Sequence, residues 1–525
     1  MKREKERCQF FDTSKLKETE GIRKRCRADF IEEALMERFP DEKIVVTTVQ
    51  LNETGIYEGT GNFLSRFLKL SKKQKELPPY CEIQLQHIMD GGIEKIMIWS
   101  PLSWNDRFAG TAGGGTCTGG QKHVTCADNT VRGWTLPYAL MNGFTAATAD
   151  AGNVDGFKDY MVEPKTGKIQ KTLYENWRAR TTHWMTILGR AVAEILHSRP
   201  VRYSYMNGGS GGGRQSLMEA QEYPDDYDGI WASCPAINWT KFVLAGLWPI
   251  AVMNTYSYIL PPKKIRYFTE QVWKSVGGPK EYYALERKVE FDPYRLVGEK
   301  TKAGSVTKMD AMMMQKIWDG PRKKDETRLW YGFRPGVVFW NVGIPVGSFY
   351  YSLMAKKPKP FVITTNYARW VTQNRKEKFS KITISEFEKL FEKSSLKFSD
   401  AAGDKADLSA FAAHGGKLLI DHGLNDPLIP VDGTIDYYKR LCEASGGQEN
   451  VRSFCRLYLT PGDGHGNCWG QGPGITESGG MSALMKWVEQ DEAPRELRAV
   501  RVEKKSGNLI EKTTRRAVHD IEEWD

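Results

Sequence analysis

The chain has 525 residues, of which 40% are hydrophobic, 27% charged and 11% aromatic. This length exceeds what one compact core usually holds, so we expect two domains or one domain with a large insertion. No apolar run reaches the about eighteen residues that a membrane-spanning helix needs. The net charge of +10 is spread along the chain, which argues against a nucleic-acid-binding protein.

The N-terminal residues and the cysteines bear on the cellular compartment. Residues 1–7 are mostly charged and contain no apolar core, so we expect no secretory signal peptide. The nine cysteines include no Cys-x-x-Cys pair, and we therefore expect no zinc site. Together these features predict a cytoplasmic protein whose thiols are mostly free.

The first elements along the chain are a helix and a group of strands. Residues 29–39 predict an amphipathic helix whose apolar face carries Phe30, Ala34, Leu35 and Phe39. A strand follows at 43–51. The turn Asp90-Gly91-Gly92 then predicts a hairpin between strands at 80–89 and 95–99.

Strands and helices alternate from there to residue 237. The expected elements are a buried strand at 143–150, a long helix at 177–197, and short strands at 201–205 and 230–233. Such alternation predicts a parallel sheet with helices on both faces.

From about Asn238 to Phe411 this alternation disappears. The segment is rich in aromatic residues and lysine, and it predicts helices around 262–276, 308–319 and 385–393. The sheet resumes at 416–423. We therefore predict a discontinuous catalytic domain, 1–237 and 412–525, and a lid domain, 238–411. The last strand and the last helix are expected at 454–459 and 482–489, and a charged tail without predicted structure follows.

The turn Asn207-Gly208-Gly209-Ser210-Gly211-Gly212 contains the pattern Gly-x-Ser-x-Gly. A β-branched and aromatic strand precedes it, and residues that favour a helix follow it. This strand–turn–helix setting is the one in which a serine is exposed as a nucleophile, because glycines let the strand and the helix approach closely. We therefore predict that Ser210 is a catalytic nucleophile.

An acid and a base follow in the order Ser210, Asp426, His465, each on a loop after a strand. This is the order of an α/β-hydrolase triad, in which the histidine takes the serine proton and the aspartate orients the imidazole. His422 precedes Asp426 and would break this order, and His183 lies on a helix. Alternative acids are Asp421, Asp432 and Asp463.

Two backbone N–H groups are candidates for the oxyanion hole. Gly211 begins the helix after the nucleophile, and its N–H is the first donor. Gly114, in the glycine-rich loop Ala112–Gly115 after an early strand, is the candidate for the second. Glycine suits such a loop because bare backbone can approach a tetrahedral oxyanion closely.

At these residues the chain resembles the tannase and feruloyl esterase family, over about residues 26–487. The matching stretches are Trp104-Asn105-x-Arg107-Phe108, Gly113–Gly115, Ser204-Tyr205-x-x-Gly208-x-Ser210-x-Gly212-Gly213-Arg214-Gln215, His422-Gly423-x-x-Asp426-Pro427-Leu428-Ile429-Pro430 and Pro461-Gly462-x-Gly464-His465. The resemblance implies an α/β-hydrolase fold with a mostly parallel central sheet and a large inserted lid. It also implies a serine carboxylesterase acting on esters of aromatic acids such as gallate or hydroxycinnamates.

Two positions depart from the family pattern. The family usually has cysteines immediately before the nucleophile and after the histidine, joined as a disulfide, whereas this chain has Gly209 and Gly466. The histidine loop therefore lacks a covalent tie. The family also carries a calcium loop in its lid, but the corresponding stretch, Ser275–Tyr283, has no carboxylate cluster. We expect no calcium and no other cofactor.

Three functions are compatible with these residues. The first is hydrolysis of a small-molecule aromatic ester, without a nucleic-acid or membrane partner. The second is acyl transfer to an alcohol by the same triad. The third is a catalytically silent relative that binds aromatic ligands, against which the complete triad argues.

Overall fold

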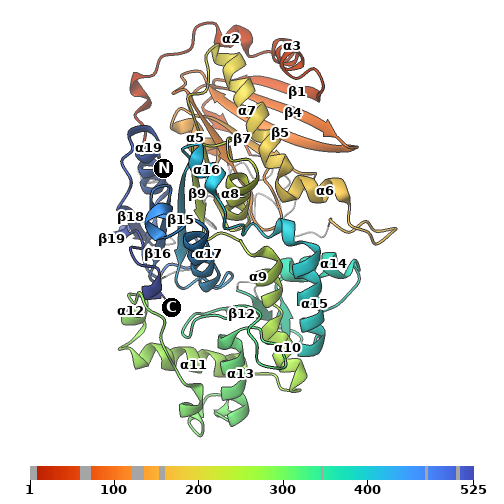
Figure 1. Cartoon of the computed structure of the whole chain (residues 1–525), viewed down its shortest axis with the longest axis vertical. Coiled ribbons are helices and arrows are strands. Elements are labelled where there is room, and N and C mark those ends of the chain that lie inside the picture. Colours follow the sequence, from red (N-terminus) through yellow and green to blue (C-terminus); the bar gives the residue numbers. More distant parts are fainter. Residues whose placement is uncertain are drawn as a thin grey trace.

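The computed structural model describes residues 9–59, 73–120, 135–152, 160–343, 347–466, 471–503 and 509–524. Within these residues, nine strands form the central sheet (Figure 1). Their spatial order is β1 (Lys43–Asn52), β4 (Tyr80–Met89), β5 (Gly92–Pro101), β7 (Thr145–Asp150), β6 (Arg107–Thr111), β8 (Tyr203–Gly209), β9 (Gly229–Ser233), β15 (Lys417–Gly423) and β16 (Cys455–Thr460).

The sheet is antiparallel at one edge and parallel over the rest. β1, β4, β5 and β7 pair antiparallel, and the expected hairpin has Met89 opposite Gly92. From β7 to β16 all pairs are parallel. The carboxyl ends of β8, β9, β15 and β16 therefore lie at the same edge, where loops after parallel strands carry ligand sites.

Helices cover both faces of the sheet, which confirms the predicted layering. One face packs against α3 (Ala28–Arg38), α7 (Thr181–His197), α8 (Gly211–Glu222) and α17 (Asp432–Ala444), and the other against α5 (Leu136–Met141) and α19 (Glu477–Gln490). In α3 Leu35 is buried as predicted, together with Ile31, whereas Phe30 is 41% exposed and was wrongly placed on the buried face. No helix among the described residues is both long and apolar enough to cross a membrane.

The segment 238–411 lies below and beside the central sheet in the view of Figure 1. Most of its buried apolar residues form one hydrophobic cluster. Its helices are α9 (Trp239–Ala245), α10 (Trp248–Thr255), α11 (Pro262–Ser275), α12 (Pro279–Tyr282), α13 (Lys308–Asp319), α14 (Val362–Thr372), α15 (Ile384–Lys397) and α16 (Ser409–Ala413), with short strands β12 (Trp340–Val342), β13 (Phe349–Tyr351) and β14 (Pro358–Pro360). Trp177 and Met161 also join this cluster, so the two parts share apolar contacts. The exact domain boundaries stay a prediction.

The described residues of the charged C-terminal segment form two strands. β18 (Glu496–Val502) pairs antiparallel with β17 (Gly474–Ile475) and with β19 (Leu509–Arg516). Successive side chains of β18 point to opposite faces, so a strand can form here without a continuous apolar run. Leu497 and Ala499 are buried, while Glu496 and Arg498 are exposed.

Cys26 and Cys81 form a disulfide, an exception to the expectation that the thiols are mostly free. The residues are 55 positions apart and meet because the helical lead-in packs on β4. Among the described residues Cys234, Cys442 and Cys455 are buried free thiols, and the buried Cys117 Sγ donates to Gly119 O at 3.2 Å. Cys8, Cys126 and Cys468 lie outside the described residues. The cytoplasmic location stays a prediction, and a structural disulfide is typical of oxidising compartments.

Candidate active site

Ser210 occupies a tight turn between β8 and α8. Its φ of 60° and ψ of −121° are a strained conformation for a residue with a side chain. Neighbouring glycines make the turn possible, since a Cβ on Gly208 would lie 2.3 Å from the Gly212 carbonyl oxygen. The hydroxyl is therefore presented at the carboxyl end of β8, beside the first turn of α8.

The Ser210 backbone is attached to the end of β9. Its N–H donates to the Ser233 carbonyl at 3.0 Å, and its own carbonyl accepts from Ala236 N–H at 2.9 Å. Cys234 lies between these two anchoring residues. The turn after β9 therefore holds Cys234 close to the Ser210 turn.

Asp426 follows β15 and is buried, and both of its carboxylate oxygens have hydrogen-bond partners. Its Oδ1 accepts the N–H groups of Leu428 at 2.8 Å and Ile429 at 2.9 Å. Its Oδ2 accepts from His465 Nδ1 at 2.6 Å and contacts His422 Nε2 at 3.0 Å. Burial opposes ionisation, but the His465 charge and the histidine hydrogen bonds hold the pKa of this carboxyl well below its usual value.

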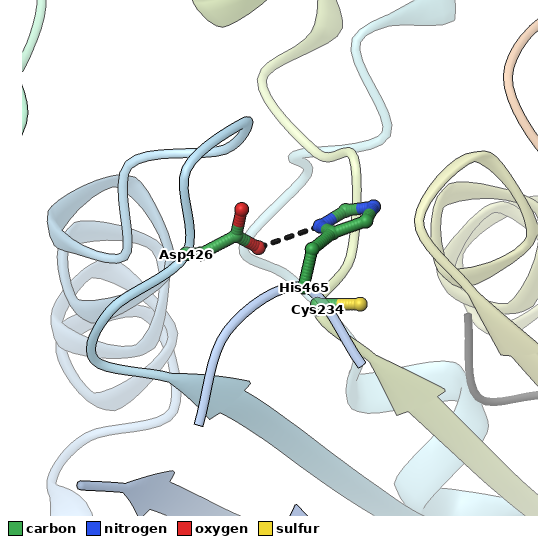
Figure 2. A group of neighbouring side chains, drawn as sticks. All are labelled: Cys234, Asp426 and His465. Carbon is green, nitrogen blue, oxygen red and sulfur yellow. Dashed lines mark hydrogen bonds and ion pairs between the residues drawn. The ribbon is translucent and has the colours of Figure 1, made fainter. Parts of the chain in front are cut away.

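His465 lies on the loop after β16 and is 1% exposed (Figure 2). Burial alone would lower the pKa of its imidazole, but the facing Asp426 outweighs burial and the pKa lies well above its usual value. With Nδ1 engaged by the carboxylate, the other ring nitrogen is the one that can take a proton. Ser210 Oγ makes no hydrogen bond within the described part of the chain, and such bonds commonly tighten only around a substrate.

The alternative histidines and acids considered from the sequence make other contacts. His422 is fully buried behind Asp426, where its Nδ1 meets Thr434 Oγ1 at 2.8 Å. Asp421 accepts from Trp231 Nε1 at 2.8 Å, and Asp432 pairs with Arg334 at 2.7 Å. His183 pairs with Asp226 at 2.7 Å. Asp463 accepts the Gly464 N–H at 3.0 Å.

Asn425 is a functional candidate that the sequence reasoning missed. Its backbone N–H donates to Asp463 O at 3.0 Å, and its Oδ1 accepts the N–H of Gly462 at 2.9 Å. Its Nδ2 donates to Tyr282 Oη, in the inserted segment, at 3.2 Å. One side chain thus joins the acid loop, the histidine loop and the inserted segment, at a place where the family disulfide is missing.

The glycine-rich loop lies directly against the Ser210 turn. A Cβ on Gly211 would lie 2.3 Å from Gly115 O, so the two backbones are in close contact. Gly113 N–H already donates to Gln215 Oε1 at 3.1 Å, whereas Gly114 faces open space. The first N–H groups of α8, including that of Gly211, have no partner inside the helix. The oxyanion roles of Gly211 and Gly114 stay predictions.

Two places are relevant to metal binding. In Ser275–Tyr283 the single carboxylate is Glu281, and calcium takes about six to eight oxygen ligands, so these residues do not fit calcium. Within the described residues, Cys234, Asp426 and His465 could hold an ion, since one ligand atom from each lies within 4.8 Å of the others (Figure 2).

Comparison with known proteins identifies the family of this chain. Residues 89–279 and 292–520 match the family model described as tannase and feruloyl esterase. A probable feruloyl esterase of Arthroderma benhamiae is 33% identical over 436 residues, covering 78% of this chain and 76% of the relative. A mono(2-hydroxyethyl) terephthalate hydrolase of Piscinibacter sakaiensis is 25% identical over 496 residues, covering 81% and 78%.

Solved structures show the same fold. A tannin acyl hydrolase from Aspergillus niger superposes with a TM-score of 0.76 at 18% identity, covering 96% of this chain and 93% of that one. Feruloyl esterase B from Aspergillus oryzae gives 0.72 at 18% identity, covering 91% and 93%. The predicted α/β-hydrolase fold and the predicted resemblance are confirmed. The chain belongs to the tannase and feruloyl esterase family and is a carboxylic ester hydrolase.

Proposed function

We propose that this protein is a serine esterase that hydrolyses esters of aromatic acids through an acyl-enzyme on Ser210. The observation that carries the serine mechanism is the buried Asp426–His465 pair, 2.6 Å apart, at the sheet edge where the Ser210 turn also lies. A hydroxyl needs such a base because it is a weak nucleophile at neutral pH.

Each residue has one task in this mechanism. Ser210 Oγ attacks the ester carbonyl while His465 accepts its proton, and Asp426 holds the imidazole in place and stabilises its positive charge. The N–H groups of Gly211 and Gly114 stabilise the oxyanion. His465 then returns the proton to the departing alcohol, and a water molecule repeats the sequence to release the acid.

The aromatic acid class is supported by the relatives. Their names describe feruloyl esters and a terephthalate half-ester, and ferulate and terephthalate are both aromatic acids. The inserted segment adds aromatic side chains close to the acid loop, where Tyr331 and Phe333 line a small cavity together with Leu428. This cavity has a volume of about 10 Å³, which is too small for an aromatic ring, so the support for the aromatic class comes from the relatives.

Turnover of methyl ferulate, methyl gallate and a short p-nitrophenyl ester tests the proposal. We expect at least one aromatic ester to be cleaved, and Ser210→Ala to lose about 10⁶-fold in kcat. Ser216→Ala is a matched control, because this hydroxyl on the same helix only bonds back to Gly212 O at 3.0 Å. A phosphonate ester should label Ser210 in the parent chain and in the control.

The outcomes separate the candidate functions. Cleavage of only the p-nitrophenyl ester would leave the serine mechanism and refute the aromatic class. A product formed mainly with an added alcohol would identify an acyltransferase. An Ser210→Ala variant as active as the control would refute the mechanism.

A further inference from the structure

Three segments far apart in sequence bring a thiol beside the candidate base. Cys234 directly follows β9, Asp426 follows β15 and His465 follows β16. Figure 2 shows the Cys234 sulfur below the imidazole, whose Nδ1 points to Asp426. All three residues are almost completely buried, with Cys234 and His465 each 1% exposed.

The backbone holds Cys234 in this position. Its φ of 34° lies in the left-handed region that residues with a Cβ seldom adopt, and its N–H donates to Asp421 O at 2.6 Å. The anchoring of Ser210 to Ser233 and Ala236 encloses Cys234 from both sides. The thiol is therefore part of the wall around the reacting groups, although the proposed ester chemistry does not use it.

Thiolate, imidazole and carboxylate form a donor set typical of zinc and related ions. Ligands of a tetrahedral zinc ion, with bonds of about 2.0–2.3 Å, lie roughly 3.3–3.8 Å apart. Here one ligand atom from each residue lies within 4.8 Å of the others. The three groups are therefore close enough for small side-chain movements to let them act on one ion.

Asp426 would act as the outer partner of such an ion. Its two oxygens already take four contacts from Leu428, Ile429, His422 and His465. A histidine that binds zinc commonly donates its other ring N–H to a carboxylate, as His465 Nδ1 does to Asp426. The second ring nitrogen and the Cys234 sulfur are then the direct ligands.

We propose that Cys234 Sγ and His465 form an inhibitory binding site for a thiophilic divalent cation such as Zn²⁺ or Cd²⁺, oriented by Asp426. Water completes the coordination. Each bound ion releases the Cys234 thiol proton, because the thiolate is the ligand. The ion occupies the nitrogen that would accept the Ser210 proton, so ester hydrolysis stops. The inhibition rests on the proposed function; the binding does not.

Cadmium is the direct probe, because a thiolate–cadmium bond gives an ultraviolet charge-transfer absorption. The chelator-treated protein, with its Cys26–Cys81 disulfide intact, is titrated with Cd²⁺, and Zn²⁺ is then added as a competitor. Cys234→Ala and Cys234→Ser remove the soft ligand, the latter with little change in volume. Cys442→Ala is the matched control, since Cys442 is also a buried free thiol but lies on α17.

We expect one cadmium per chain in the parent and in Cys442→Ala, and none at this site in either Cys234 variant. The loss in affinity should exceed the ~10–100-fold that removal of an outer partner costs. Inhibition of p-nitrophenyl ester hydrolysis, measured for each variant against its own metal-free rate, should follow the same pattern.

The two proposals fail in different ways. Charge-transfer absorption that persists in both Cys234 variants, or is absent from the parent, overturns the site. Cadmium bound through Cys234 without inhibition of an active enzyme overturns the inhibitory role. Binding through Cys234 in a chain that cleaves no ester supports the site and counts against the proposed esterase.

Discussion

The Asn425 side chain offers a sharp test of what holds the candidate base in place. Asn425→Ala removes the hydrogen bond from Gly462 N–H and the one to Tyr282 Oη, but keeps the backbone bond to Asp463. Two hydrogen bonds of about 0.5–1.5 kcal/mol each predict a loss of about 1–3 kcal/mol in the free energy of unfolding. The histidine loop also loses a connection at a place where Gly209 and Gly466 stand instead of the family's two cysteines.

The catalytic effect should exceed the effect on stability. A displacement of about 1 Å at a reacting group can cost about 10²-fold, so we expect kcat to fall by about that factor while KM changes little. Chemical denaturation and ester kinetics on the same preparations measure both quantities. Asn425→Asp keeps the acceptor for Gly462 N–H and loses only the donor to Tyr282. Its kcat should therefore lie between that of the parent and that of Asn425→Ala.

Asn254→Ala is the matched control for this experiment. Its Nδ2 donates to Ser380 O at 3.2 Å and to Ile382 O at 2.8 Å, so it also makes two hydrogen bonds, but within the inserted segment. Both alanine variants should lose similar stability, and only Asn425→Ala should lose kcat. Equal kcat in the two variants would refute the inference that Asn425 positions His465.

Further predictions concern ionisation. Asp426→Asn removes the carboxylate that orients His465, and kcat should fall by about 10⁴-fold; a loss below tenfold would contradict its role. Because the pKa of His465 is raised and the base must be neutral, kcat/KM should rise with pH through an apparent pKa above the usual ~6.5. A midpoint below that value would be contrary evidence. Burial, reinforced by Asp226, raises the pKa of Glu219 well above its usual value, so folding favours the protonated form and stability declines with rising pH. Relative to the parent, Glu219→Gln should gain about 1.4 kcal/mol per pH unit from about pH 5 upward, in denaturation curves, until the folded-state pKa is reached. Glu222→Gln is the control. Burial raises the pKa of Glu222, but Lys405 and Arg178 outweigh burial, and the pKa lies below its usual value. Above about pH 5 Glu222 is therefore charged in both the folded and the unfolded chain, and the difference in stability between this variant and the parent should not change with pH.

Local patterns in the sequence were sufficient for most of the sheet and for the setting of Ser210. The hairpin turn at Asp90-Gly91-Gly92 and the glycines around Ser210 act through backbone geometry within a few residues, so a short stretch carries the information. The C-terminal strands were missed because β19 is mostly charged and polar, and because β17, which pairs with β18, has only two residues. The disulfide was missed because cysteine spacing does not determine pairing.

The chain order Ser210, Asp426, His465 already indicated a hydrolase, and family membership agrees with it. Only the tertiary structure decided what surrounds these residues. His422 contacts Asp426 from behind, the Asn425 side chain joins three segments, and Cys234 lies close to His465. These contacts join residues from separate loops, and they depend on which strands are neighbours and in which register they pair. No local pattern encodes that, because neighbouring parallel strands can be hundreds of residues apart and their loops meet only when the sheet is complete.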